Sequence, residues 1–276
     1  MDTTREHEGV IDGMHALENL RRPSLLTLSP LLDTILSCDA RDSPVTAGRA
    51  GLVPGILHLL AGPQGFLSTI LMRAAVSAQR PPVEGGIDAT WVHYIELNND
   101  FDPYVISKIA QEKRLTPSRV LGRIEISRGF NWDQAVEIIG RYLPARVKSR
   151  SIVLISGITT WFDPASQEHY RGLREMIHGL KQCFHEKHVY MLATAPVADG
   201  STFKPKGGNN LTHFAGVVAT FSCKQLNSGS IVTTCELVQH PFLPRRVRES
   251  WDHSGNRKAR MARGSSLRFT TLEEFL

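Results

Sequence analysis

Short apolar runs alternate with segments of helical periodicity between residues 55 and 196, and this alternation limits the folds open to the chain. Strands are expected at 55–62, 91–97, 121–127, 151–158 and 188–196, with helices at 66–79, 102–114, 131–147 and 168–186. Because these strands are largely apolar, both of their faces need cover, as in a parallel sheet flanked by helices. Two further strands, 216–224 and 230–239, enclose an Asn- and Gly-containing turn that indicates a β-hairpin. The predicted fold is therefore α/β, a mostly parallel sheet flanked by helices with a C-terminal antiparallel hairpin.

The composition agrees with one sizeable domain that carries tails. Of 276 residues, 41% are hydrophobic and 21% are charged, the profile of a soluble globular protein. No segment approaches the roughly 18 uncharged apolar residues of a membrane helix, and residues 1–13 contain no apolar signal core. The four cysteines form no CxxC pair and lack the spacing of a zinc site, so we expect no metal. We expect an intracellular protein with reduced thiols.

Positive charge gathers in the last part of the sequence. The net charge is +5, and residues 242–268 contain eight Lys or Arg against two acidic residues, a surplus of six. This one stretch more than accounts for the whole excess. A basic segment of this kind favours a polyanion, nucleic acid first, although a solubilising tail has the same composition.

Four segments with distinctive motifs follow one another along the chain. Residues 81–96 (PPVEGGIDATWVHYIE) place Pro-Pro and Gly-Gly before an apolar strand, and residues 101–134 continue through a helix and a strand to Arg-Gly-Phe-Asn. Residues 204–224 place Gly-Gly before a helical turn and a hairpin, which leads to VQHPFLPRRV at 238–247. In this order and spacing the segments resemble the RecA/RadA recombinase family, from about residue 26 to residue 247. The resemblance implies a RecA-like core of the ATPase type.

The resemblance places a phosphate-binding loop at residues 62–69, and this run departs from the working pattern GxxxxGK[ST]. Gly62, Gly65 and Thr69 fit the pattern. Leu67 stands where the second motif glycine is expected, and its side chain would crowd the path of the phosphates. Ser68 replaces the lysine that neutralises the charge of the β- and γ-phosphates.

Further positions that the resemblance assigns to ATP hydrolysis have also changed. Ser156 stands where an Asp for Mg²⁺ is expected, and Asn98 stands where a Glu polarises the attacking water. An amide cannot act as a general base, and Ala195 replaces a sensing Gln. We therefore expect a pseudo-ATPase that is not an enzyme and needs no cofactor. Weak ATP binding without hydrolysis, and Glu96 as a displaced base, are the alternatives left open.

The family binds DNA through two loops, and the resemblance places them at 162–174 and 196–210. Backbone amides of glycine-rich loops, together with cationic side chains, suit phosphate contacts without base readout, as expected for single-stranded DNA. Solvated loops without a ligand would carry the same cations. The candidate DNA-binding residues are Arg171, Arg174, Lys204, Lys206, Gly207 and Gly208.

The last eight residues, 269–276, follow a basic segment that contains Gly and Ser. They resemble the PIP box that binds the sliding clamp PCNA. Leu272, Phe275 and Leu276 fall at the anchor spacing, and one helical turn would place them on one face. Phe269 replaces the usual Gln of this motif. Clamp binding is the favoured interpretation, and a terminal segment that folds back on the core is the other.

Together these features predict a polar lead-in at 1–25, a RecA/RadA-like core at 26–247, a basic flexible linker at 248–268 and a PIP-box-like peptide at 269–276. The expected function is that of a non-catalytic accessory factor in DNA recombination or repair. It would bind DNA, a RadA-type recombinase or a DNA polymerase, and the sliding clamp would recruit it. The alternative is a scaffold subunit of a replication or polymerase complex that does not itself bind DNA. The expected location is cytoplasmic and nucleoid-associated, or nuclear in a eukaryote, without membrane attachment.

Overall fold

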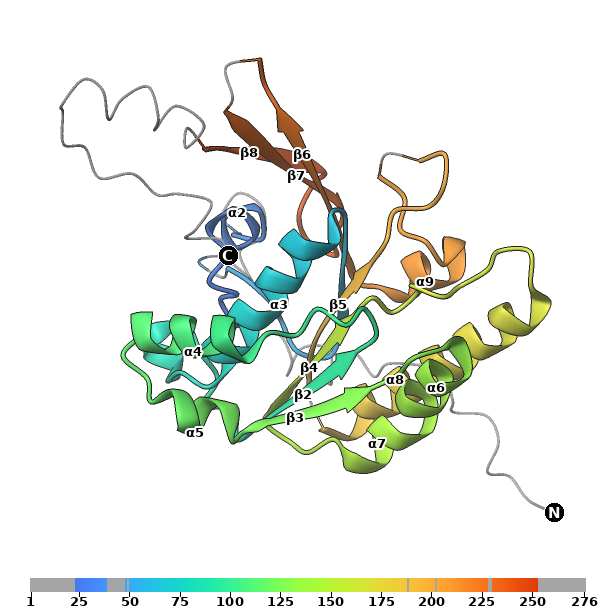
Figure 1. Cartoon of the computed structure of the whole chain (residues 1–276), viewed down its shortest axis with the longest axis horizontal. Coiled ribbons are helices and arrows are strands. Elements are labelled where there is room, and N and C mark those ends of the chain that lie inside the picture. Colours follow the sequence, from blue (N-terminus) through green and yellow to red (C-terminus); the bar gives the residue numbers. More distant parts are fainter. Residues whose placement is uncertain are drawn as a thin grey trace.

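The computed structural model describes residues 23–38, 48, 50–187, 189–201, 203–227 and 230–252. Within these residues one eight-stranded sheet forms the centre of the molecule (Figure 1). The strands are β1 (Leu57–Ala61), β2 (Trp91–Glu96), β3 (Ile124–Arg128), β4 (Ser151–Ser156), β5 (Tyr190–Ala195), β6 (Val217–Gln225), β7 (Ile231–Gln239) and β8 (Arg246–Asp252).

The strand order is β3-β2-β4-β5-β1-β6-β7-β8. All pairs from β3 to β6 are parallel, whereas β6, β7 and β8 pair antiparallel. This arrangement confirms the predicted α/β class, with its mostly parallel sheet and C-terminal antiparallel hairpin. The central strands β1, β4 and β5 are buried at every position, as the apolar runs required.

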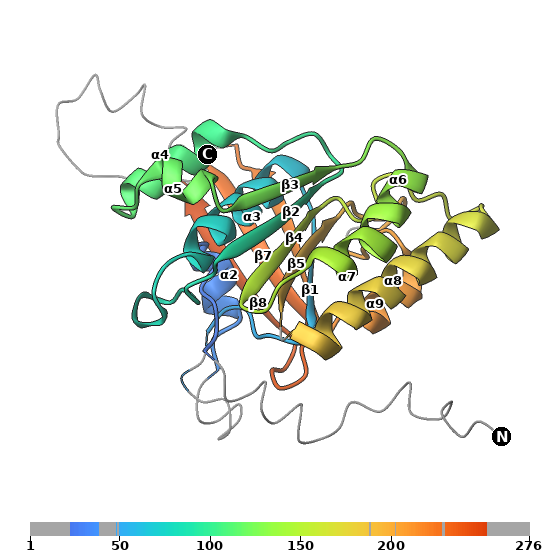
Figure 2. The ribbon, with the colours of Figure 1, turned by 90° about the horizontal axis from the view of Figure 1, so that it is seen from below.

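Helices cover both faces of the sheet (Figure 2). On one face α2, α3, α4 and α5 close a core that includes Leu71 and Ile106, and on the other α6, α7, α8 and α9 close a core that includes Trp132 and Leu180. The helices are α2 (Pro30–Ile35), α3 (Gln64–Ala78), α4 (Pro103–Glu112), α5 (Pro117–Leu121), α6 (Trp132–Glu137), α7 (Leu143–Arg146), α8 (Gln167–Lys187) and α9 (Gly208–Phe214), with a 3₁₀ turn η1 (Pro82–Glu84) and a π-helical turn η2 (Ile138–Tyr142).

Two helix starts follow directly from their capping residues. Asp102 accepts a hydrogen bond from the Tyr104 amide at 2.8 Å, and Pro103 occupies the first helical position of α4, as predicted. Asn131 caps α6 by accepting from the Gln134 amide at 2.9 Å. The Gln134 side chain returns to accept from the amide before Asn131, so the two side chains form a reciprocal cap.

The last strand extends the core beyond its predicted limit. Residues 248–252 belong to β8, so the expected linker from 248 begins inside the sheet, and only its later residues lie outside the described part of the chain. Arg246 also has a structural task, because its guanidinium donates to the carbonyls of Ile35 and Ser37 at the end of α2. Cation-to-carbonyl bonds of this kind stabilise the end of a helix. None of the described helices is both long enough and apolar enough to cross a bilayer.

Candidate functional site at the carboxyl edge of the sheet

The carboxyl ends of β1, β2 and β4 meet at one edge of the sheet, and three of the predicted nucleotide-site residues meet there. Ser68 comes from α3, Asn98 follows β2 and Ser156 ends β4. A fourth residue, Asp100, joins them. The Ser156 hydroxyl donates to Asp100 Oδ1 at 2.8 Å, the Ser68 hydroxyl donates to Asp100 Oδ2, and Gln64 Nε2 lies 3.5 Å from the same oxygen. A single carboxylate therefore connects α3 to β4.

The hydrogen bonds continue from Ser156 to the loop after β4. Asn98 Nδ2 donates to Ser156 Oγ at 3.3 Å, and the Thr160 hydroxyl donates to Asn98 Oδ1. We call Ser68, Asn98, Asp100, Ser156 and Thr160 the Asp100 cluster. Ser68 and Ser156 are 3% and 0% exposed, so these hydroxyls are satisfied inside the protein and not by bulk water.

Glu96, the candidate displaced base, is fully buried, and both of its carboxylate oxygens already accept hydrogen bonds. Its Oε1 accepts from the Asn98 amide at 3.0 Å and its Oε2 accepts from the Phe101 amide at 2.6 Å. Burial, and next the negative charge of Asp100, raise the pKa of Glu96 above its ordinary value, against the opposing effect of these backbone bonds. The geometry gives Glu96 the role of shaping the turn after β2, in which Asn99 has a φ of +57°.

The segment expected to form a phosphate-binding loop is mostly helical. Helix α3 begins at Gln64, so only Gly62 and Pro63 separate it from β1. Gly62 has a φ of +152°, and a Cβ there would lie 2.5 Å from the backbone oxygen of Phe221. Close approach of β6 thus explains this glycine without any phosphate.

The remaining positions of the motif lie on α3 itself. The Ser68 hydroxyl, which donates to Asp100, also lies 2.9 Å from the Gln64 carbonyl, so the two acceptors share its one proton. The Thr69 hydroxyl donates to the Gly65 carbonyl at 3.1 Å, as is common within a helix. Gly65 is exposed, with open space around a built Cβ. Leu67 is 1% exposed and packs in the core. The predicted crowding of a phosphate path by this side chain is not seen, because the leucine faces inward.

The second predicted DNA loop contacts the segment that comes just before the first. Thr159, in the loop after β4, donates its hydroxyl to the Lys206 carbonyl at 2.8 Å. The second loop is ordered by a β-bridge between Val197 and Pro205 and ends at Gly207 and Gly208, both with positive φ. The first loop is shorter than expected, because α8 begins at residue 167. Two of its candidate cations, Arg171 and Arg174, are exposed on that helix.

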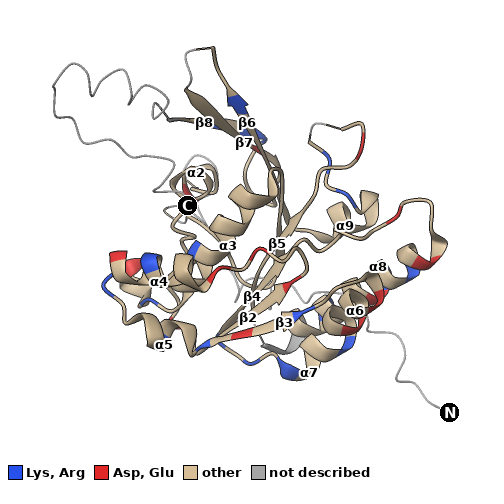
Figure 3. Cartoon of the chain, viewed as in Figure 1, with Lys and Arg blue, Asp and Glu red and all other residues tan. Residues whose placement is uncertain are grey.

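The charge around these loops is mixed (Figure 3). Residues 163–174 and 196–208 contain four Lys or Arg, of which Lys204 is exposed and Lys206 is partly buried. The same residues include Asp163, Glu168 and Asp199, which leaves a surplus of one positive charge. Phosphate binding at these loops would therefore rest on local placement of the cations and not on a strong overall field.

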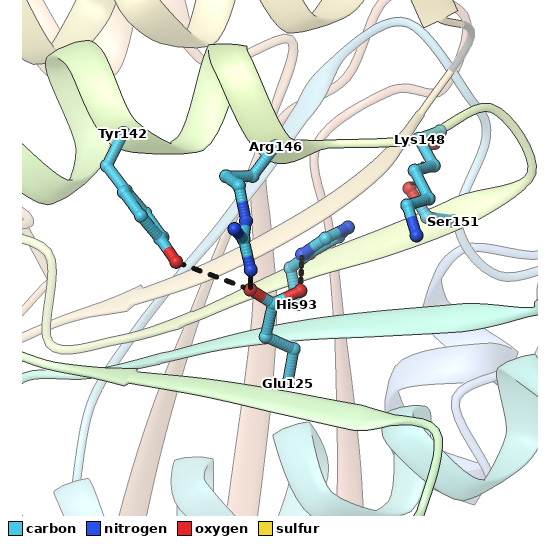
Figure 4. Close-up of polar contacts among 6 residues, drawn as sticks. All are labelled: His93, Glu125, Tyr142, Arg146, Lys148 and Ser151. Carbon is cyan, nitrogen blue, oxygen red and sulfur yellow. Dashed lines mark hydrogen bonds and ion pairs between the residues drawn. The ribbon is translucent and has the colours of Figure 1, made fainter.

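A second polar cluster joins β2, β3 and α7 on the face covered by α8 (Figure 4). Glu125 accepts from Arg146 Nη2 at 2.8 Å and from the Tyr142 hydroxyl at 3.5 Å, and His93 Nδ1 lies 3.5 Å from its other oxygen. Burial alone would raise the pKa of Glu125, but the bond from Arg146 and the nearby His93 lower it below its ordinary value. This cluster connects an edge strand to its covering helix, which is a structural role.

The comparison with known protein families adds no assignment, since no family model matches the chain. Within the described residues, no group of three or more His, Cys, Asp or Glu is arranged to hold a metal ion. The predicted clamp-binding residues Leu272, Phe275 and Leu276 lie outside the described residues.

The sequence reasoning missed Asp100, the residue that unites the cluster. One signal was available: Asp100 lies four residues after the end of a buried strand, at the edge where parallel strands collect polar groups.

Proposed function

We propose that this protein is a non-catalytic RecA/RadA-type accessory factor in DNA recombination or repair. It binds DNA, a recombinase or both, and the sliding clamp recruits it through residues 269–276. A parallel sheet closed by antiparallel strands at its C-terminal end supports this proposal, because it is the layout that the motif order implies.

The observation that carries the non-catalytic part is the Asp100 cluster. By the resemblance, Ser68 takes the place of the phosphate-binding Lys, Ser156 that of the Mg²⁺-binding Asp and Asn98 that of the catalytic Glu. All three side chains already have hydrogen-bond partners within the cluster: Ser68 and Ser156 donate to Asp100, and Asn98 donates to Ser156. A phosphate entering this edge would meet the carboxylate of Asp100 where it needs a cation. The helical start of α3 also removes the loop whose amides would wrap the phosphates.

Nucleotide turnover tests this part directly. The full-length chain with ATP and Mg²⁺ should release no phosphate above the buffer rate, with or without DNA. Turnover that disappears in Thr69→Ala would overturn the pseudo-ATPase assignment. Saturable binding of a fluorescent ATP analogue without turnover would retain it, since the proposal concerns hydrolysis.

DNA binding at the two loops is tested by charge reversal. Fluorescence anisotropy with labelled single- and double-stranded DNA should show at least tenfold weaker binding for the double variant Lys204→Glu/Lys206→Glu, with a shallower salt dependence. The double variant Lys113→Glu/Arg119→Glu is the matched control, because it makes the same charge change at two exposed sites, the C-cap of α4 and the last turn of α5. A wild-type chain without affinity for either DNA form would favour the scaffold function instead.

Clamp recruitment has a separate test. Calorimetry should show micromolar or tighter binding of the full-length chain to the sliding clamp of the same organism, and loss of that binding in a chain ending at Ser266. The full-length variant Leu272→Ala/Phe275→Ala should behave like the truncated chain, because these two side chains are the proposed anchors. Equal binding by all three would place the contact elsewhere and remove the PIP-box assignment.

A further inference from the structure

A group of cations lies at the amino ends of the parallel strands, at the opposite end of the sheet from the Asp100 cluster. Trp91 is the first residue of β2 and pairs with Ser151 at the start of β4. On the other side of β2, the Val92 amide donates to the carbonyl of Arg123, the residue just before β3, at 2.9 Å. Because neighbouring strands lie about 5 Å apart, Arg123 and the start of β4 flank Trp91 at a separation of about 10 Å.

Trp91 and Arg123 lie on the face of the sheet that α7 and α8 cover. Successive side chains of a strand point to opposite faces, and Val92 and Ile124 pack in the core under α3 and α4. Trp91 and Arg123 therefore point to the other face, as does Glu125, and both are partly exposed. The turn from α7 into β4 reaches the sheet on this same face, since its Lys148 contacts the Trp91 ring.

Three cations around Trp91 form no salt bridge with a described residue. They are Arg123, Lys148 and Arg150, of which the last two are exposed. The Lys148 ammonium lies 4.1 Å from the centroid of the Trp91 ring, and the Ser151 hydroxyl donates to the Lys148 carbonyl at 2.5 Å. The ring and the turn thus hold this cation in place while it remains open to a ligand.

Carboxylates near these cations are either paired or on the other face. Glu125 accepts from Arg146 at 2.8 Å (Figure 4). Asp88, the nearest acidic residue before Trp91, lies beside the end of α3, where its amide donates to the Arg80 carbonyl at 2.9 Å. We call Trp91, Arg123, Glu125, Arg146, Lys148 and Arg150 the amino-end surface. Its four cations and one carboxylate leave a surplus of three positive charges, and Figure 3 shows blue along α7 and the turn that follows it.

The aromatic rings of this region favour a duplex over single-stranded nucleic acid. Sites for single strands offer open ring faces on which bases stack. Here Lys148 lies over the Trp91 ring, and the Arg146 guanidinium lies over the Tyr142 ring at 5.3 Å. Cations without an open ring suit contacts to phosphates alone, and a duplex presents one phosphate charge per about 1.7 Å of its axis.

We propose that the amino-end surface binds the phosphate backbone of duplex DNA. It would be a second DNA contact, because the two predicted loops follow β4 and β5 at their carboxyl ends, and strands of six residues span about 20 Å. A chain with contacts at both ends of the sheet would hold two DNA segments at once. That consequence rests on the proposed function, whereas the duplex contact itself does not need the loops.

Fluorescence anisotropy of the full-length chain with labelled duplex DNA, at several salt concentrations, tests the proposal. Lys148→Glu/Arg150→Glu should bind duplex about tenfold more weakly or worse, and the slope of log K against log salt should become shallower by about two. Lys113→Glu/Arg119→Glu is again the matched control, since it makes the same charge change at the same end of the sheet but on the face that α4 and α5 cover. Its affinity should stay within about threefold of wild type, because solvent and salt screen distant surface charges.

A second variant separates loss of charge from repulsion. Lys148→Gln/Arg150→Gln removes both charges without reversing them, and should show a smaller loss of affinity in the same direction. A urea midpoint equal to that of wild type confirms that each variant is folded. Affinity of both Lys148/Arg150 variants equal to that of the control overturns the proposal.

Comparison with the loop variants separates this surface from the proposed function. Duplex binding lost in Lys204→Glu/Lys206→Glu but kept in Lys148→Glu/Arg150→Glu assigns the contact to the loops and overturns the proposal. The reverse pattern supports it and removes the loops from the proposed function. A loss as large for oligothymidylate as for duplex overturns the duplex assignment. A wild-type chain without affinity for duplex also overturns it, and an acidic protein would then be the partner of these cations.

Discussion

Buried His58 should make this protein less stable as the pH falls, because its surroundings favour the neutral form of the ring. The side chain lies in β1 and is 1% exposed. Its Nδ1 lies 3.2 Å from the Met191 carbonyl, and its Nε2 accepts from the Val53 amide at 3.3 Å. These partners suit one neutral tautomer, with the proton on Nδ1. A second proton on Nε2 would point at the Val53 N–H, so the charged form loses a bond and gains a repulsion.

Burial is the main cause that lowers the pKa of His58 from 6.5 to about 3, and a charge on His240 would add to it. Because the folded-state pKa lies below the unfolded-state pKa, the unfolded chain binds the extra proton between these two values. Stability from neutral His58 is therefore complete above pH 6.5 and declines as the pH falls. With an unfolded pKa of about 6.5, the loss from this one residue between pH 7 and pH 5 is about 2 kcal/mol.

Urea unfolding of wild type and His58→Gln at pH 7 and pH 5 measures this loss. Glutamine can replace one of the two hydrogen bonds but does not titrate, so the variant is less stable at both values. The informative quantity is the difference between the two pH dependences, in which contributions from other groups cancel. We expect wild type to lose about 2 kcal/mol more than the variant on going to pH 5.

Equal pH dependence in wild type and variant would refute the reasoning, since it would mean that His58 titrates alike in both states. His58→Asn provides a second comparison if the glutamine variant is too unstable to measure. A direct check is the ring proton shift of His58 in the folded protein, which should show no titration between pH 8 and pH 5.

Three further predictions concern single residues. Gly62→Ala should cost more than about 2 kcal/mol, because its Cβ would meet the Phe221 backbone at 2.5 Å, whereas Gly65→Ala should add about 0.5 kcal/mol in urea unfolding by favouring the helix. Burial raises the pKa of Asp33 from 3.8 to about 6, so the stability of the wild type falls as the pH rises through that range. Asp33→Asn should therefore increase the free energy of unfolding by up to about 3 kcal/mol at pH 7 and by little at pH 4. Asp100→Ala should cost about 1–2 kcal/mol by the same assay, because the buried Ser156 hydroxyl loses its acceptor, whereas Ser68 can still donate to the Gln64 carbonyl.

The sheet could be predicted from the sequence because strands that are buried on both faces consist of consecutive apolar residues. The apolar run at 151–158 contains β4, and Asp102-Pro103 marks the first turn of α4 as expected. Strand β8 was not predicted, because it lacks such an apolar run. Residues 246–252 contain only two apolar side chains, Val247 and Trp251, both exposed at the edge of the sheet, and the other five are charged or polar, so in sequence the segment resembles a basic linker.

The candidate site was harder to predict because it depends on contacts between distant segments. Ser68, Asp100 and Ser156 come from three separate elements, and no local pattern shows that one carboxylate joins two hydroxyls. The start of α3 was also beyond the sequence argument. A glycine-containing run after a strand predicts a loop, but the helix begins at Gln64 and absorbs most of that run.

The residues that fit the phosphate-binding pattern have structural explanations, and this bears on how the pattern is interpreted. Gly62 is required by the backbone of β6, and Thr69 bonds within its own helix. Neither contact needs a nucleotide, so their presence is no argument for one. Ser68 and Ser156 carry more information, because both donate to Asp100 and an aspartate in place of Ser156 could not make that hydrogen bond. An aspartate at position 156 would also place a second carboxylate against Asp100, which is unfavourable inside a protein. Ser68, Ser156 and Asp100 therefore form one interdependent set of side chains, in which a change at one position alters the hydrogen bonds of the others.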